Sequence, residues 1–248
     1  MSVTSPQTDW YSADWPAPPR VRTLITTRNG GVSAAPYNSL NLGLHVGDDE
    51  TRVLANRALV AAQLPGEPAW LNQTHSTTVV EAGPFGAPPD ADASFSHASG
   101  QVCVVMTADC LPVLFAERNG RAVGAAHAGW RGLCNGVLEA GIATMGVAHA
   151  YLMSWLGPAI GPDAFEVGAE VRQAFIARDP ASQAAFSPIG DDKYLADIYL
   201  LARQRLEAAG ISAIYGGGQC TVIDRDRYFS YRRDGCTGRM ASLIWIEP

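Results

Sequence analysis

The chain has 248 residues, of which 47% are hydrophobic and 17% are charged. This length suffices for one large domain or two small ones, with a substantial buried core. The formal net charge of −6 at pH 7 argues against a general nucleic-acid binder, because such a protein normally carries a basic surface.

The N-terminal segment and the cysteines indicate where the protein works. Residues 1–20 are polar and contain prolines and tryptophans, and they lack the basic start and apolar run of a secretory signal. No stretch approaches the length of a membrane span. The five cysteines are widely spaced and odd in number, so a disulfide framework is not expected. We therefore expect a cytoplasmic protein with no membrane partner.

The first half of the chain mixes short strands with loops. Residues 1–20 are expected to form a loose N-terminal arm. A helix is predicted to open at Asp48 and to end before Pro65, because acidic residues occupy its first turn and apolar residues follow at helical spacing. Apolar and β-branched runs predict strands at residues 21–27, 69–71 and 77–81. Loops are expected at the glycine-rich turn 28–33, at the irregular segment 35–47 and at residues 83–99. The segment 35–47 is expected either on the surface or wrapped over a site.

The stretch from Gln101 to Gly136 has the most informative pattern. One apolar run ends at Cys110, and a later one ends at His127. Asn119-Gly120 lies between them as a favoured hairpin turn. Because a hairpin brings the ends of its strands together, Cys110 and His127 are expected to lie side by side at one end of a sheet.

The remainder of the chain alternates strands with helices, without a regular βαβ rhythm, an internal repeat or a dividing linker. Helical patterns cover residues 134–145, 168–178 and 194–209, and strand patterns cover residues 150–156, 211–215 and 241–246. We expect an α+β (mixed α/β) fold in which residues 21–248 form a single domain of sheets with helices packed on them.

Three interpretations fit Cys110 and His127. With His75, which lies in a polar break between two predicted strands, they form one thiolate and two imidazoles, and three such ligands with an open fourth position are typical of catalytic zinc. A metal-free Cys-His dyad is the second interpretation, with Asp109 as the orienting carboxylate. The third is a buried cysteine next to a structural histidine. The spacing alone leaves all three open.

Four side chains are candidates for binding substrate. Arg131 follows His127 at a strand-to-helix turn, where free N–H groups and a fixed cation suit a phosphate or carboxylate. Arg233 belongs to a cluster of aromatic residues and arginines that could stack a base and hold an anion. Arg28 and Asn41 stand in the two N-terminal loops. Each of the four also has a purely structural interpretation, such as a surface ion pair.

Seven motifs resemble those of the YfiH-like family, also called the multicopper polyphenol oxidase or "laccase domain" family and a purine nucleoside phosphorylase family. In order along nearly the whole chain they are RNGGVS at 28–33, SLNLGLHVGDD at 39–49, NQTHS at 72–76, TADCLPVL at 107–114, HAGWRG at 127–132, LGPAIGP at 156–162 and SYRRDGCTGRMA at 230–241. The resemblance implies a mixed α/β domain of layered sheets and helices. It also implies a catalytic zinc bound by His75, Cys110 and His127.

The resemblance further implies phosphorolysis of adenosine, inosine and methylthioadenosine, with nucleoside and phosphate as substrates, and deamination of adenosine. An alternative that it also implies is a hydrolase that removes a misplaced serine from peptidoglycan precursors. Five histidines with no His-X-His pair argue against a multicopper cluster. Two His and one Cys nevertheless also suit a copper ion, so a copper-binding polyphenol oxidase and a non-catalytic metal-binding protein remain as further alternatives.

Overall fold

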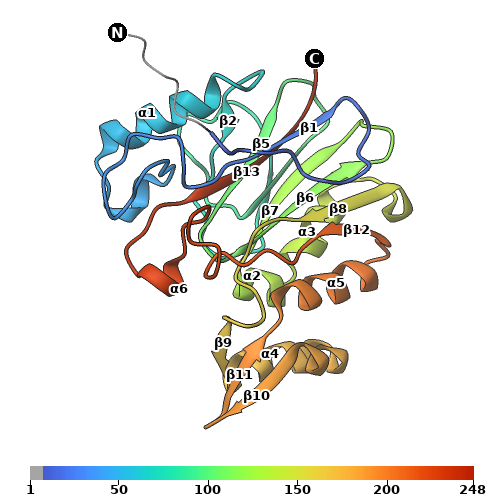
Figure 1. The fold of residues 1–248 in the computed structure, drawn as a ribbon. Helices are drawn as coiled ribbons and strands as arrows, with labels where there is room; N and C mark the ends of the chain where they lie inside the picture. Colours follow the sequence, from blue (N-terminus) through green and yellow to red (C-terminus); the bar gives the residue numbers. More distant parts are fainter. Residues whose placement is uncertain (1–7) are drawn as a thin grey trace.

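The computed structural model describes residues 8–248, and two β-sheets packed against each other form their centre (Figure 1). Within these residues, the four-stranded sheet contains, in spatial order, β1 (Val21–Ile25), β13 (Met240–Ile246), β5 (Val102–Thr107) and β2 (Pro68–Ala69). The six-stranded sheet of the same region contains β12 (Ala213–Gly216), β8 (Leu152–Leu156), β6 (Leu111–Glu117), β7 (Val123–Ala128), β4 (Ala93–Ser96) and β3 (Val79–Glu81).

Alternating side chains of the buried strands fill two different apolar layers. In β5, Cys103 and Val105 face the space between the sheets, whereas Val104 packs in the core on the outer side. In β6, Leu114 faces the other sheet and Phe115 faces outward. Because successive strand residues point to opposite faces, strands that are apolar at every position indicate sheets covered on both sides.

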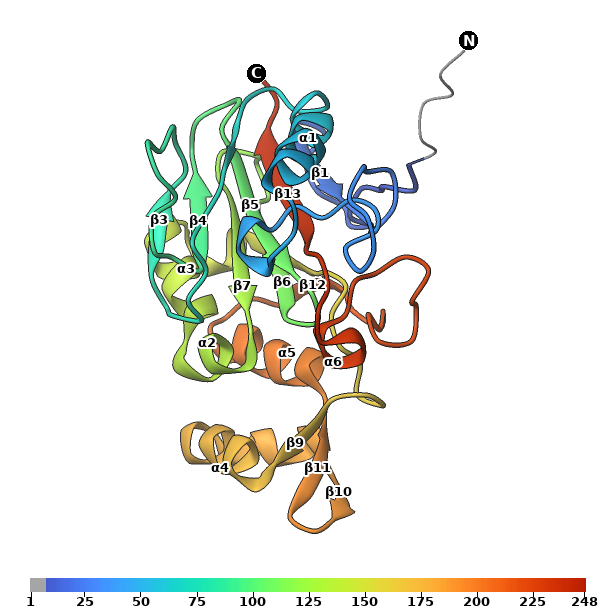
Figure 2. The same ribbon diagram turned by 90° about the vertical axis from the view of Figure 1, so that its left-hand side faces the viewer.

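Helices supply those outer covers (Figures 1 and 2). Helix α1 (Glu50–Ala61) covers the four-stranded sheet, and its Val60 packs in the same core cluster as Leu40 and Leu42. Helices α2 (Trp130–Asn135), α3 (Val137–Met145) and α5 (Ile198–Ala208) cover the six-stranded sheet. The fold is therefore the mixed α/β arrangement of layered sheets and helices that we expected.

A small third sheet lies beyond α5, at the bottom of Figure 1. It contains β10 (Phe186–Gly190), β11 (Lys193–Ala196) and β9 (Glu166–Gly168), and α4 (Ala169–Arg178) packs beside it. The shorter helices are the 3-10 turns Leu44–Val46, His149–Tyr151 and Pro180–Ala185 and the helix α6 (Tyr231–Asp234). None of the helices of residues 8–248 combines the length and the apolar character that crossing a membrane requires.

Three expected elements differ from the structure. The helix predicted over 194–209 begins only at Ile198, because residues 193–196 pair as β11 and the Asp197 side chain caps the helix by accepting from Leu200 N. The helix predicted over 134–145 starts at Trp130 and is interrupted at Gly136, whose φ of +104° ends α2. The loop predicted over 83–99 contains β4, which lies between β3 and β7.

Two loop predictions also need correction. The surface alternative for segment 35–47 is wrong for Leu40, Asn41 and Leu42, which are fully buried because they cover the outer face of the four-stranded sheet. The N-terminal arm was expected to be loose, and its residues 1–7 lie outside the described part of the chain. Farther along the arm, Tyr11 forms a bridge with Ile25 and packs with Trp15 against the core between the sheets.

Candidate active site

The β6–β7 hairpin brings Cys110 and His127 together, as the sequence predicted. The two strands are antiparallel, with Leu111 opposite Ala128 and Pro112 opposite His127. Cys110 immediately precedes β6, so its thiol lies next to the end of β7. His127 is 4% exposed, so it lies at the buried floor of the site rather than at its rim.

His75 completes the group from the loop between β2 and β3. Its backbone is left-handed, with φ +61°, and its Nε2 lies 3.7 Å from Cys110 Sγ. The rings of His75 and His127 meet edge to face at 4.8 Å between centroids. The ligand atoms of the three residues all lie within 4.8 Å of one another, and no further His, Cys, Asp or Glu of residues 8–248 joins them. The group could therefore hold a metal ion and leave a coordination position open.

One buried carboxylate holds both histidines, one through its ring and the other through its backbone. Asp92 is 0% exposed, and its Oδ1 accepts from His127 Nδ1 at 2.8 Å and from the backbone N of His75 at 3.0 Å. Its Oδ2 accepts from Ser76 N and Ser76 Oγ, at 2.6 and 2.8 Å. Asp92 thus leaves His127 Nε2 as the nitrogen available to a metal ion, which is the usual arrangement behind metal-binding histidines.

The charges of the group reinforce one another. Burial raises the pKa of the Cys110 thiol, but the neighbouring His127 and His75 outweigh that effect, and the net shift is downward. Burial likewise lowers the pKa of His127, but the Cys110 thiolate and Asp92 more than compensate and raise it. The site therefore favours the thiolate form of Cys110, which is the form that binds a metal ion or attacks as a nucleophile.

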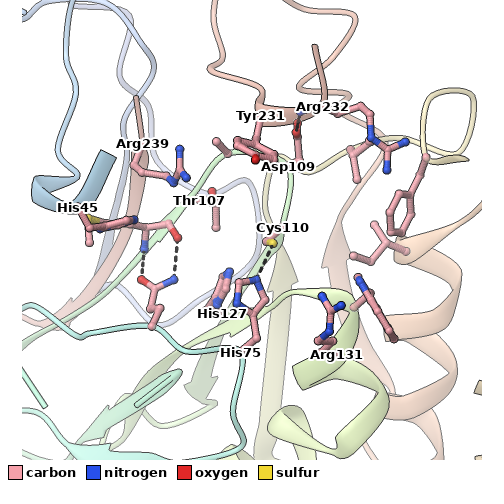
Figure 3. A pocket seen from close by; sticks show the side chains of 17 residues that line it. His45, His75, Thr107, Asp109, Cys110, His127, Arg131, Tyr231, Arg232 and Arg239 are labelled. Atoms are coloured by element: carbon pink, nitrogen blue, oxygen red, sulfur yellow. Dashed lines mark hydrogen bonds between the residues drawn. The ribbon is translucent and has the colours of Figure 1, made fainter. Parts of the chain in front are cut away.

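A cavity of about 530 Å³ opens above the three residues (Figure 3). Its walls combine apolar and aromatic side chains with three arginines. The apolar and aromatic residues are Trp130, Ile160, Phe165 and Ile198, and the arginines are Arg131, Arg232 and Arg239. Such a volume accommodates a small organic ligand, and the mixture of apolar walls with a few charged groups is typical of ligand sites.

Besides His75, Cys110 and His127, two further predicted site residues line this cavity. Arg131 lies over the ring of Trp130, with 4.4 Å from its guanidinium carbon to the ring centroid. Asp109 also lines the cavity, but its carboxylate accepts from Thr221 Oγ1 and from Arg232 N, both at 2.6 Å. Asp109 therefore anchors the segment that carries Arg232, and the carboxylate in contact with His127 is Asp92.

The other predicted residues lie elsewhere. Arg28 donates to the carbonyl oxygens of Asn38 and Arg225. Arg233 donates to those of Thr221, Val222 and Tyr228. These two arginines share a separate surface pocket. Asn41 is fully buried and is absent, like Arg28 and Arg233, from the described residues that line the metal-ligand cavity.

Sequence reasoning missed Asp92, His45, Arg232 and Arg239. Asp92 stands in the predicted loop 83–99, and no sequence pattern links it to His127, which lies 35 residues farther along the chain. His45 stands alone in the predicted loop 35–47, with no patterned partner in the sequence, and the structure places it in the wall of the cavity. Arg232 and Arg239 stand in the same motif as Arg233, and only the structure distinguishes which of these arginines face the cavity.

Residues 22–247 match the family described as multi-copper polyphenol oxidoreductase laccase. The chain belongs to this family. A relative from Pseudomonas aeruginosa named purine nucleoside phosphorylase is 54% identical over 239 residues, which cover 96% of this chain and 98% of the relative. The Escherichia coli relative named purine nucleoside phosphorylase YfiH is 54% identical over 235 residues, or 94% of this chain and 96% of that one.

The fold of the family is known from solved structures. A Neisseria meningitidis protein of the family DUF152 has 57% sequence identity to this chain and a TM-score of 0.95, with 97% of this chain and all of that one covered. The YfiH-like family membership that the seven motifs indicated is thereby confirmed. The family's two descriptions, an oxidoreductase and a nucleoside phosphorylase, point to different chemistry at one site.

Proposed function

We propose that this protein is a zinc-dependent purine nucleoside phosphorylase that accepts adenosine, inosine and methylthioadenosine and also deaminates adenosine. One observation carries the proposal: the His75, Cys110 and His127 group opens into a cavity whose walls combine aromatic rings with three arginines. Two relatives at 54% identity bear the name purine nucleoside phosphorylase, which supports this assignment over an oxidase.

The donor set fits zinc. Two imidazole nitrogens and one thiolate are ligands that zinc prefers, and Asp92 fixes His127 in the orientation that such a site requires. When bound, zinc would supply Lewis-acid polarisation of a substrate oxygen and a lowered pKa of a bound water. Those properties suit both a glycosyl transfer to phosphate and the hydrolytic removal of an amino group.

The residues of the cavity account for substrate binding. The ring faces of Trp130 and Phe165 offer stacking surfaces for a planar base. The guanidinium groups of Arg131, Arg232 and Arg239 have no carboxylate of residues 8–248 within 4.0 Å. They are therefore available to an anionic substrate such as phosphate.

The proposal is tested by incubating the zinc-loaded protein with adenosine, with and without phosphate, and separating the products by chromatography. Adenine and ribose 1-phosphate are expected only with phosphate. Inosine is expected without phosphate, and inosine together with the hypoxanthine formed from it is expected with phosphate. The control is Cys110→Ala, which removes the thiolate ligand. If neither adenine nor inosine exceeds the control, the proposed function is wrong.

The oxidoreductase description of the family motivates a second candidate, a copper-binding polyphenol oxidase. Two histidines and a cysteine can bind a copper ion, but residues 8–248 contain a single such donor group, whereas a multicopper cluster needs many more histidines. Elemental analysis of the purified protein, together with oxygen uptake in the presence of a polyphenol, decides between the two. Release of serine from a mispaired peptidoglycan precursor would instead favour the editing hydrolase.

A further inference from the structure

Arg239 lines the cavity close to the turn that carries Cys110. It directly precedes β13, whose Met240 lies opposite Thr107 of β5. The chain continues from Thr107 through Ala108 and Asp109 to Cys110, so the sheet register fixes Arg239 beside the turn that carries the thiolate. Figure 3 shows its guanidinium on the same side of the cavity as His45.

Some N–H donors of the Arg239 guanidinium have no hydrogen-bond partner within residues 8–248. Its Nη1 donates to the carbonyl oxygens of Thr237 and Gly238, at 3.1 and 3.0 Å. Within residues 8–248, no acceptor is in hydrogen-bonding range of its Nε or Nη2, and no carboxylate lies within 4.0 Å. Burial lowers the pKa of Arg239, although Cys110 and Asp109 partly oppose this effect. A partly buried cation with free donors is stabilised by an anion from solution.

The chain holds Arg239 rigidly. Asn41 Oδ1 accepts from Arg239 N at 3.0 Å, and Leu42 N donates to Arg239 O at 3.2 Å. Gly43 lies against its side chain so closely that an added Cβ would be 2.8 Å from Arg239 Cγ. The buried segment 40–43 therefore fixes the arginine before any ligand arrives, which lowers the entropy cost of binding.

The two ends of the cavity differ in chemistry. At one end, burial and the charge of Arg239 lower the pKa of His45. This favours the neutral imidazole, which can both donate and accept a hydrogen bond. At the other end, Arg131 and Arg232 lie over the rings of Trp130 and Phe165, at 4.4 and 5.8 Å. Figure 3 shows the metal-ligand group between these two ends.

We propose that Arg239 binds the attacking phosphate, with His45 beside it, and that the purine base lies at the opposite end against Trp130 and Phe165. This inference rests on the proposed phosphorylase function. An oxygen of hydrogen phosphate forms a bond to C1′ of the ribose, and the bond from C1′ to N9 breaks with its electron pair passing to the base. The proton that hydrogen phosphate loses is the one that the base gains, so the products are ribose 1-phosphate and the free purine.

The decisive variant is Arg239→Gln, which keeps a polar side chain on a shorter stem and removes the charge. Steady-state kinetics with inosine are expected to give a KM for phosphate raised about 10- to 100-fold, since hydrogen bonds to charged groups are worth this much, and a KM for inosine changed less than about twofold. Arg239→Lys is expected to fall between Arg239→Gln and the unaltered protein. Arg22→Gln, at an exposed ion pair with Glu247, is the matched control and leaves both KM values unchanged.

Direct binding separates this inference from the proposed function. Calorimetric titration of the zinc-loaded protein with inorganic phosphate is expected to show binding that Arg239→Gln weakens by a similar factor and Arg22→Gln does not. Phosphorolysis by the unaltered protein with an unchanged KM for phosphate in Arg239→Gln overturns the inference and leaves the function intact. If Arg239→Gln does not fold, as judged by circular dichroism, the same comparison made with Arg239→Lys decides the matter. Absence of phosphorolysis by the unaltered protein overturns both.

Discussion

Asp92 links the His127 ring and the His75 backbone through a single side chain. Each of its oxygens accepts hydrogen bonds, Oδ1 from His127 Nδ1 and His75 N, and Oδ2 from Ser76. A neutral amide can accept at only one of these positions and must turn a donor toward the other. A carboxylate is therefore required at this position for two reasons: its charge, and the several N–H groups that donate to it.

Replacement of Asp92 by Asn should therefore weaken metal binding. We expect the zinc affinity of Asp92→Asn to fall about 10- to 100-fold, as is usual when the partner of a ligand histidine is changed. Competition with a chromophoric chelator measures the affinity. Asp90→Asn is the matched control, because within residues 8–248 the Asp90 side chain bonds only to Asn72 and its loss should leave the affinity unchanged. An equal effect of both variants would contradict the role assigned to Asp92.

Gly129 controls the space in which His75 sits. Its φ of −59° and ψ of 153° suit any residue, but a Cβ there would lie 2.5 Å from His75 Cδ2 and 3.0 Å from Cys110 Sγ. We expect Gly129→Ala to displace the His75 ring and to lower zinc affinity at least about tenfold, without loss of fold. Gly141→Ala in α3 is the control, because a Cβ added there would lie 3.9 Å from the Phe115 ring, an ordinary contact distance. Zinc affinity and far-UV circular dichroism of both variants give the comparison.

At the level of elements, the β6–β7 hairpin is stabilised at the end opposite the site. Glu117, at the end of β6, accepts from the backbone N and the guanidinium of Arg121 and from Asn119. These bonds close the turn predicted at Asn119-Gly120. Since Cys110 and His127 lie at the other end of the same strands, the turn sets the register that brings them together.

The Glu117 carboxylate gives the hairpin a pH-dependent stability. Hydrogen bonds from Arg121 lower the pKa of Glu117 below its usual value, so the stabilisation is present above the unfolded pKa of about 4.3 and is lost as the pH falls through the folded value. Glu117→Gln should unfold at a lower temperature than the parent at pH 7. The difference should shrink in thermal scans below about pH 4. A constant difference over this range would contradict the assignment.

The sequence predicted those elements whose local pattern agrees with their packing. The runs that became β1, β6, β7, β8, β12 and β13 are apolar or β-branched, and they fold as predicted. In contrast, β4 reads Ala-Ser-Phe-Ser and β10 contains Pro188 and Gly190, so their pairing is decided by neighbouring strands rather than by propensity. The same reason explains the missed contacts of Asp92 and Arg239, since no short-range pattern shows which polar side chain a distant strand brings to a cavity.

At the scale of the whole molecule, the site lies where the two large sheets meet. Cys110 stands between β5 of one sheet and β6 of the other, and His127 lies on β7. His75 comes from the loop that follows β2. A bound metal ion would therefore tie together segments of both sheets, and its binding free energy would oppose their separation.

Metal loading should accordingly raise the thermal stability of the whole fold. With zinc at about 1,000 times its dissociation constant, linkage predicts about 4 kcal/mol of added stability, or a midpoint shift of roughly 8–16 °C for a chain of this size. Differential scanning calorimetry with zinc and with a chelator measures the shift. Cys110→Ala should abolish most of it, and an undiminished shift in that variant would place the binding site elsewhere.

The order of strands in the four-stranded sheet has a consequence during synthesis on the ribosome. β13 follows every other strand in the sequence, yet it lies between β1 and β5 and pairs with both. While the intervening chain is being translated, β1 and β5 have apolar faces and open edges but no partner between them, a condition that favours aggregation of nascent chains. The wall of the cavity that contains Arg239 is likewise completed last, so a polypeptide terminated before β13 has neither a closed sheet nor a finished cavity.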